Sequence, residues 1–261
     1  MEVLIYDSAD VCGSVVARII ERQLHAKPAS VVGLATGSSP LAVYQKLIDA
    51  CRTGATSFRQ ARAFLLDEYV GLADGHPQAY RSFIRNAFTS HIDIDDEAVV
   101  GPPTDADSLR SGVEMYDVAI QEAGGIDVQL LGIGSDGHIG FNEPGSSLRS
   151  KTRLKTLTSR TRQDNARFFD GELEAVPQHV VTQGIGTILE ARHIVLIATG
   201  LAKAEPVASA IEGPVAAMVP ASALQLHQHV TVVLDEKAAS SLTLGAYFRE
   251  VQAHKPSWQQ P

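Results

Sequence analysis

Short apolar segments alternate with helix-like segments along the whole chain, and this alternation constrains the fold more than any other feature. Six strand-length segments rich in Val, Ile and Leu cover residues 3–6, 30–36, 63–66, 128–134, 193–198 and 230–234. Several are apolar at every position, as in parallel strands covered on both faces. Helical periodicity separates them over residues 9–25, 40–52, 105–123, 200–211 and 237–253. The sequence therefore predicts an α/β fold with a doubly wound, mostly parallel, Rossmann-like sheet and helices on both faces.

The chain of 261 residues contains no linker, internal repeat or low-complexity segment, so we expect residues 1–261 to form a single domain. Residues 144–183 differ from the rest, because they are rich in Ser, Thr, Arg and Asp and only weakly periodic. A long polar insertion after a strand often covers a binding site. We therefore expect a lid or an interaction surface over about residues 144–183.

The composition of the chain argues against some classes of partner and indicates where in the cell the protein acts. The net charge of −8 argues against nucleic acid as a partner, although one phosphate group needs only a few local cations and amides. The sequence has no apolar run of membrane-spanning length and no signal peptide at its start, which predicts a cytoplasmic protein without a membrane partner. Cys12 and Cys51 fall in helical patterns without metal or redox spacing, so we expect both to be reduced.

A glycine-rich segment over residues 131–144 follows the fourth predicted strand and carries Asp136, His138 and Glu143. Loops at the carboxyl ends of parallel strands face the ligand crevice of open α/β sheets. A histidine beside carboxylates can be held in one tautomer and used as a proton carrier. The segment predicts acid–base chemistry on a small polar substrate. The alternative is a turn whose charged residues are only solvated.

Residues 33–40 close the second predicted strand and open a helix, with Thr36, Gly37, Ser38 and Ser39 before the proline at position 40. Free backbone N–H groups, hydroxyls and the positive helix end together favour an anion, most naturally phosphate. The spacing matches neither a Walker loop nor a dinucleotide-binding fingerprint. A capped helix start without a ligand is the alternative.

Asp67 and Glu68 stand where the third predicted strand ends. A partly desolvated carboxylate at this edge is a competent base for a carbon-bound proton, whereas an Asp that caps the next helix is the alternative. Polar groups follow the strand ends near residues 36, 67 and 134, all at one edge of the predicted sheet. The convergence of three such loops predicts a binding pocket.

Two cations outside these loops are further candidates. Arg167 lies in the expected lid, and Lys203 stands in the first turn of a predicted helix. A lysine beside the positive end of a helix is unfavourable unless it meets an anion, so we expect both side chains to bind phosphate. Solvated surface charges are the alternative. His227 and His229 have no third ligand nearby in the sequence, so no metal is expected.

Five segments resemble the glucosamine-6-phosphate isomerase/deaminase family of amino-sugar catabolism, and the resemblance spans nearly the whole chain. They are residues 36–40, 67–72, 136–144, 153–158 and 224–227. The resemblance implies that Asp67 moves a proton between C2 and C1 during aldose–ketose isomerisation of glucosamine 6-phosphate. It also implies that His138, assisted by Asp136 and Glu143, opens the sugar ring. Fructose 6-phosphate and ammonia would be the products, with no cofactor, and the sequence does not decide whether galactosamine 6-phosphate is also used.

Allosteric members of this family bind N-acetylglucosamine 6-phosphate at a subunit boundary. The chain retains the matching residues, which are Ser146, Arg153, Lys155, Thr156 and Tyr247. The resemblance thus implies a homo-oligomer, either a trimer or a hexamer of two trimers. A solvated basic strand is the alternative for Arg153 and Lys155.

Two other functions belong to related proteins. A 6-phosphogluconolactonase-like hydrolase also binds a sugar phosphate without metal, but lactone hydrolysis gives no reason for a carbon base at Asp67 beside the His138 set. A sugar-phosphate-sensing domain would need a DNA-binding segment, whereas the first predicted strand here begins at residue 3.

Overall fold

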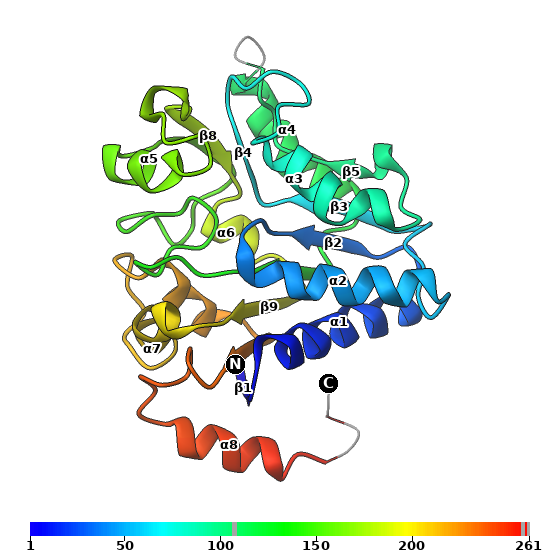
Figure 1. Ribbon diagram of the computed structural model, residues 1–261, viewed down its shortest axis with the longest axis vertical. Helices are drawn as coiled ribbons and strands as arrows, with labels where there is room; N and C mark the ends of the chain where they lie inside the picture. The colour runs from blue at the N-terminus through cyan, green and yellow to red at the C-terminus, as the bar shows by residue number, and fades with distance from the viewer. Residues whose placement is uncertain (106–108, 257–258, 260–261) are drawn as a thin grey trace.

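The computed structural model describes residues 1–105, 109–256 and 259, and a seven-stranded sheet crosses its centre (Figure 1). Its strands, in spatial order, are β1 (Glu2–Tyr6), β10 (Val230–Asp235), β9 (His193–Ala198), β6 (Val128–Leu131), β2 (Val31–Leu34), β3 (Arg62–Leu65) and β5 (Val99–Val100). Every neighbouring pair is parallel. The predicted fold class is therefore confirmed, and each of the six predicted segments contains a strand.

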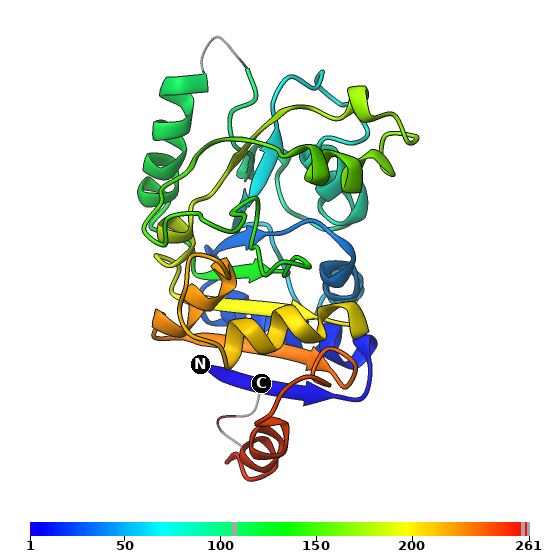
Figure 2. The same cartoon turned by 90° about the vertical axis from the view of Figure 1, so that its left-hand side faces the viewer.

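Helices cover both faces of this sheet (Figure 2). One face packs on α1 (Ala9–Ala26), α2 (Ser38–Arg52) and α3 (Tyr80–Ala87). The other packs on α4 (Leu109–Glu122), α6 (Ile185–Ile188), α7 (Ala204–Ile211) and the 3₁₀ segment η5 (Pro220–Leu226). Along β1, Leu4 packs on the face covered by α1, α2 and α3, while Val3 and Ile5 pack on the opposite face, as the alternation of side chains in a strand requires. The continuous apolar runs reflect burial on both faces.

Helix α8 (Gly245–Ala253) packs along the outer strand β1. The side chain of Gln252 accepts a hydrogen bond from Ile5 N at 2.8 Å and donates one to Ile5 O at 3.2 Å. The predicted helix over residues 237–253 is thus only half correct. Its first half forms turns, because Asp235 accepts from Ala238 N and Glu212 accepts from Leu244 N.

Two other predicted helices differ at their starts. The helix expected over 200–211 begins with the 3₁₀ turn η4 (Leu201–Lys203) before α7. The helix expected over 105–123 is observed as α4, and its predicted residues 106–108 lie outside the described part of the chain. Helix α3 and the 3₁₀ turns η1 (Thr89–His91) and η2 (Asp96–Ala98) were not predicted.

A second, antiparallel sheet stands beside the first, in the order β4 (Asp67–Tyr69), β8 (His179–Thr182), β7 (Arg153–Thr156). Strand β4 continues from β3 after the single residue Leu66. Helix α5 (Ser159–Ala166) and the turn η3 (Leu173–Ala175) connect β7 to β8. Tyr69, Phe141 and Phe169 belong to the small core of this region. Residues 144–183 therefore contain two strands and a helix.

The strand order places a topological switch between β2 and β6. From β2 the chain moves outward through β3, and from β6 it moves outward in the opposite direction through β9 and β10. Ligands of open α/β sheets bind outside the carboxyl ends of strands at such a switch. The carboxyl ends of β9, β6, β2 and β3 are neighbours here, so the loops that follow them lie along one edge.

Both cysteines are free; Cys12 is buried in α1, and Cys51 is partly buried in α2. Within the described residues, every helix is too short or too polar to cross a bilayer.

Candidate active site

Asp67 lies where the chain passes from the large sheet to the small one, and its side chain is only 5% exposed. Removal of the carboxyl group from water disfavours its charged form. This burial, reinforced by the nearby charge of Glu68, raises the pKa of Asp67 to about 8. A carboxyl group with such a pKa can exchange a proton at neutral pH, as a general base requires.

Glu68 points away from Asp67 along β4 and is also buried. Its carboxylate accepts hydrogen bonds from the backbone N–H groups of Tyr69, Tyr80 and Arg81 at 2.7, 2.9 and 2.8 Å. Two of these donors belong to the first turn of α3, so Glu68 ties that helix to β4. The contact fixes the strand segment from which Asp67 projects.

His138 and Asp136 form a close pair in the loop after β6. His138 Nδ1 lies 2.6 Å from Asp136 Oδ1, and the contact lowers the pKa of Asp136 to about 2. An ionised carboxylate only accepts hydrogen bonds, so Nδ1 carries the hydrogen and Nε2 is left for proton exchange. The ring packs directly on Gly134, where an added Cβ would lie 2.1 Å from it. Only glycine fits at this position.

The loop of His138 passes close to the Asp67 carboxyl group at Gly140. A Cβ atom added at Gly140 would lie 3.4 Å from Asp67 Oδ2 and 2.8 Å from the hydroxyl oxygen of Thr182. The Asp67 segment and the His138 loop, both predicted to carry chemistry, therefore lie side by side at the edge of the sheet.

Glu143 lies farther along the same loop and is partly buried. Its carboxylate accepts a hydrogen bond from the hydroxyl of Thr161 on α5. The resemblance implies that Glu143 assists His138, whereas its contact in the structure joins the loop to the region expected to form the lid.

Thr36, Gly37, Ser38 and Ser39 form the passage from β2 into α2. Gly37 stands at the N-terminal cap position, and no side chain there accepts from the helix N–H groups. The first turn of α2 thus presents N–H donors and hydroxyl groups at the same edge as the Asp67 and His138 loops, an arrangement suited to an anion.

Lys203 of η4 and Arg167, at the end of α5, are close enough for their charges to interact. Lys203 Nζ donates to Ile133 O at 2.7 Å, in the loop after β6. Burial and the positive charge of Arg167 lower the pKa of Lys203, while Asp136 opposes this change. The Arg167 guanidinium is 4.7 Å from the centre of the Phe168 ring. Two cations close enough to repel each other favour binding of an anion between them.

The residues of the implied allosteric set occupy two distant parts of the chain. Arg153 and Lys155 share one side of β7, and Arg153 donates to Asn142 Oδ1 at 2.8 Å. Ser146 is buried nearby in sequence, and its hydroxyl has no hydrogen-bond partner among the described residues. Thr156 ends β7. Tyr247, by contrast, is exposed on α8, at the opposite end of the molecule from the small sheet (Figure 1).

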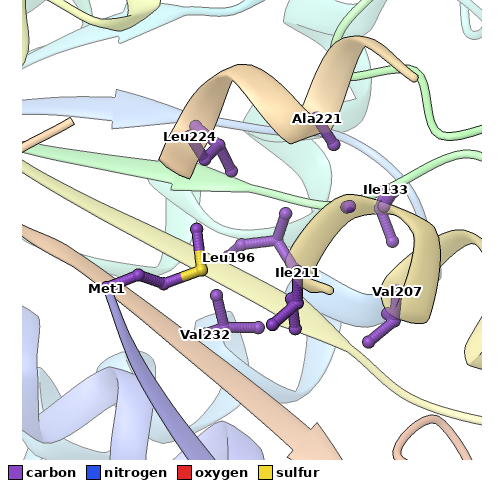
Figure 3. Close-up of a pocket in the computed structure, with 9 residues that line it drawn as sticks. Met1, Ile133, Leu196, Val207, Ile211, Ala221, Leu224 and Val232 are labelled. Atoms are coloured by element: carbon purple, nitrogen blue, oxygen red, sulfur yellow. The ribbon is translucent and has the colours of Figure 1, made fainter. Parts of the chain in front are cut away.

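A small cavity elsewhere in the molecule is entirely apolar. It lies between the large sheet and the helices α7 and η5 (Figure 3), lined by Met1, Ile133, Leu196, Val207, Ala210, Ile211, Ala221, Leu224 and Val232. It offers no polar side chain to a sugar phosphate. His227 and His229 lie just before β10, where the His229 ring stacks on His193 and His227 Nε2 contacts Ala191 O. Among the described residues, no group of three or more potential ligand side chains is arranged around a metal position.

Comparison with known proteins places the chain in a family. The family model described as glucosamine-6-phosphate isomerases/6-phosphogluconolactonase matches residues 6–233. The chain belongs to this family. Within it, a glucosamine-6-phosphate deaminase of Streptomyces coelicolor is 57% identical over 99% of both chains.

Solved structures of the family agree with this placement. A monomeric glucosamine-6-phosphate deaminase superposes with a TM-score of 0.88 and 40% identity, covering 92% of this chain and 100% of the other. A 6-phosphogluconolactonase from Trypanosoma cruzi superposes with a TM-score of 0.75 at 22% identity, covering 93% and 97%. The lactonase shares the fold and is the more distant relative.

Two residues of this site, Thr182 at the end of β8 and Gln183 directly after it, were not predicted from the sequence; they contact the His138 loop and the segment before Asp67. The β-branched residues Val180, Val181 and Thr182, followed by glycine at position 184, were the available signal for a strand. Because these residues lie in a polar stretch, the strand was not predicted.

Proposed function

We propose that the chain converts glucosamine 6-phosphate to fructose 6-phosphate and ammonia through an aldose–ketose isomerisation. One observation carries this proposal: a buried carboxyl group, Asp67 of β4, lies beside the loop that carries the His138–Asp136 pair, at one edge of the sheet. Family membership and relatives named as glucosamine-6-phosphate deaminases support the choice of substrate.

His138 acts first in this proposal, on the cyclic substrate. It delivers a proton to the ring oxygen and receives one from the C1 hydroxyl, so that the ring opens to the free aldehyde. Histidine suits this exchange near neutral pH. Asp136 holds the ring in one tautomer through the 2.6 Å contact with Nδ1, and Glu143 supports the loop from its contact with Thr161.

Asp67 then removes the proton from C2 of the open-chain sugar and returns it to C1, while a proton passes from the amino nitrogen to the C1 oxygen, which becomes a hydroxyl. The product is an imine at C2. Water adds to C2, and ammonia leaves to give fructose 6-phosphate. The enolamine and imine take up the electron pair within the substrate, so the scheme uses no cofactor and no metal. A fixed carboxylate in a water-poor site suits the carbon deprotonation.

The phosphate group is held by Thr36, Gly37, Ser38 and Ser39 together with Lys203 and Arg167. Helix N–H groups and two cations are complementary to a dianion. We also propose that residues 1–261 act as one domain in the cytoplasm, with residues 144–183 as a lid that brings Arg167 over the phosphate.

Regulation and assembly form a separate part of the proposal. Ser146, Arg153, Lys155, Thr156 and Tyr247 bind N-acetylglucosamine 6-phosphate between subunits of a trimer or hexamer. Light scattering coupled to size exclusion tests the assembly, since one solved relative is described as monomeric. The ligand should lower the substrate concentration at half-saturation, and Lys155→Ala should abolish that response without lowering the maximal rate. Hyperbolic kinetics indifferent to the ligand would contradict this part.

One coupled assay tests the main proposal. The purified chain is given glucosamine 6-phosphate, and ammonia and fructose 6-phosphate are measured separately. We expect equal amounts of both. Hydrolysis of 6-phosphogluconolactone without ammonia release from the amino sugar would instead assign the lactonase activity, and binding of sugar phosphates without turnover would indicate a sensor.

A further inference from the structure

Strand β8 lies between β4 and β7 in the small sheet. Its last residue, Thr182, pairs with Asp67 of β4 on one side and with Arg153 of β7 on the other. The residue after it, Gln183, is also completely buried. The end of β8 is thus in register with the candidate base.

The hydroxyl group of Thr182 reaches the loop that carries His138. It accepts a hydrogen bond from Phe141 N at 3.1 Å. The neighbouring Gly140 packs so closely that an added Cβ would lie 2.8 Å from this hydroxyl oxygen and 3.4 Å from Asp67 Oδ2. Thr182 therefore contacts the His138 loop where that loop passes closest to Asp67.

Gln183 binds the chain on both sides of the same junction. Its backbone N–H donates to Leu66 O at 2.8 Å, and its side-chain Nε2 donates to Leu65 O at 3.0 Å. These carbonyls belong to the two residues directly before Asp67. Its own carbonyl oxygen accepts from Asn142 Nδ2 at 2.8 Å, one residue before Glu143. One buried residue thus links the segment of the base to the loop of the acid.

We propose that Thr182 and Gln183 are positioning residues that set the placement of Asp67 relative to His138. The inference rests on the proposed function, in which one bound sugar exchanges protons first with His138 and then with Asp67. Both groups must keep their places relative to a single substrate, and small displacements reduce the rate steeply. Neither Thr182 nor Gln183 is assigned contact with the phosphate.

Thr182→Val tests the role of the hydroxyl, because valine has nearly the same shape and cannot accept from Phe141 N. We expect kcat to fall roughly 10- to 100-fold, while KM for glucosamine 6-phosphate stays close to that of the wild type. Thr182→Ser keeps the hydroxyl and should restore most of the rate. The matched control is Thr231→Val, which removes a buried hydroxyl of β10 that contacts His193 of β9, and should leave kcat unchanged.

Hydrogen exchange at the Phe141 amide gives a readout independent of activity. Protection of this amide should fall in Thr182→Val and persist in Thr182→Ser. Wild-type kcat in a Thr182→Val protein that has lost this protection would overturn the proposal, as would an equal loss of kcat in Thr231→Val.

Gln183→Met provides a second test, needed most if Thr182→Val does not fold. It keeps the side-chain volume and removes the donor to Leu65 O, so we expect the same selective fall in kcat; an unchanged kcat would count against the proposal. A wild-type chain that releases no ammonia would overturn the proposed function itself, whereas an active wild type with equally active Thr182→Val and Gln183→Met variants overturns only the positioning role.

Discussion

Asp67 and Asp136 lie at the same edge of the large sheet, yet their surroundings change their pKa values in opposite directions. Asp67 is buried beside another carboxylate, and its pKa rises to about 8. Asp136 is 46% exposed and bound to His138, and its pKa falls to about 2. At neutral pH the first is poised to exchange a proton, and the second stays ionised.

The difference shows how one edge of a sheet can supply two kinds of carboxyl group. Burial without a cation favours the protonated form, whereas a hydrogen bond from an imidazole favours the ionised form. Asp67 therefore suits proton transfer itself, and Asp136 suits orientation of His138. The variants below test this division, beginning with the largest expected effect.

Asp67→Asn should remove nearly all activity, with kcat lower by on the order of 10⁴-fold. The amide keeps the shape of the side chain but cannot take a proton from carbon. Binding of a phosphorylated inhibitor should persist, since the cations lie on other loops. Substantial ammonia release by this variant would remove Asp67 from the role of base.

His138→Gln should lower the rate on cyclic glucosamine 6-phosphate by on the order of 10²-fold. An open-chain analogue needs no ring opening, so its turnover should fall much less. The two rates are compared in the same coupled assay. Equal losses on both substrates would contradict the role of His138 in ring opening, and with it the different roles given to Asp67 and Asp136.

Lys203→Ala and Arg167→Ala should chiefly raise KM, because each removes a charge-assisted contact of roughly 1.5 to 3 kcal/mol. The matched substrate is unphosphorylated glucosamine, with which the variants and the wild type should differ little. If the variants still prefer glucosamine 6-phosphate over glucosamine as strongly as the wild type does, residues other than Lys203 and Arg167 recognise the phosphate.

Glu68→Gln should shift the acidic limb of the pH profile of kcat/KM to lower pH. The base form of Asp67 exists above its pKa, so the wild-type limb should lie near pH 8. Removal of the neighbouring negative charge makes ionisation of Asp67 easier. An unmoved limb would show that burial alone sets the pKa of Asp67.

Asp67 and Asp136 should contribute to the free energy of unfolding with opposite dependence on pH, and thermal unfolding can measure this difference. The folded pKa of Asp67 is raised, so its contribution is present below pH 4 and is lost as pH rises through about 8. The folded pKa of Asp136 is lowered, so its contribution is present above pH 4 and is lost as pH falls toward 2. At pH 8, Asp67→Asn should therefore stabilise the protein and Asp136→Asn should slightly destabilise it. An Asp67→Asn variant that melts below the wild type at pH 8 would contradict the assigned burial effect.

Six strands of the large sheet could be predicted from the sequence because they are apolar on both faces, whereas β5, with only two residues, was not predicted. The small sheet could not, because β7 alternates partly buried and exposed residues and carries Arg153 and Lys155. Such a four-residue segment does not differ from a polar loop until its partner is known. Strand β4 was missed for another reason: its polar residues Asp67 and Glu68 are buried by neighbours distant in the sequence.

Only part of the candidate site could likewise be predicted from the sequence. Motif residues such as Asp67 and His138 stand out because carboxylates and imidazoles at strand ends have an evident chemistry. Thr182 and Gln183 have no such signal, since their importance comes from hydrogen bonds to Phe141 and Leu65, which are 41 and 118 positions away. Contacts of this kind follow from the register of β8 against β4, and local sequence does not contain that register.

The last described helix, α8, also covers part of an outer strand of the large sheet. Outer strands expose N–H and C=O groups with which a second molecule can pair, and β1 is such a strand. The carboxamide of Gln252 occupies both groups of Ile5, as a neighbouring strand would. A chain cut before Gly245 keeps every candidate catalytic group but leaves this strand open to intermolecular pairing. Loss of the C-terminal helix is therefore a route to aggregation rather than to a defective catalyst.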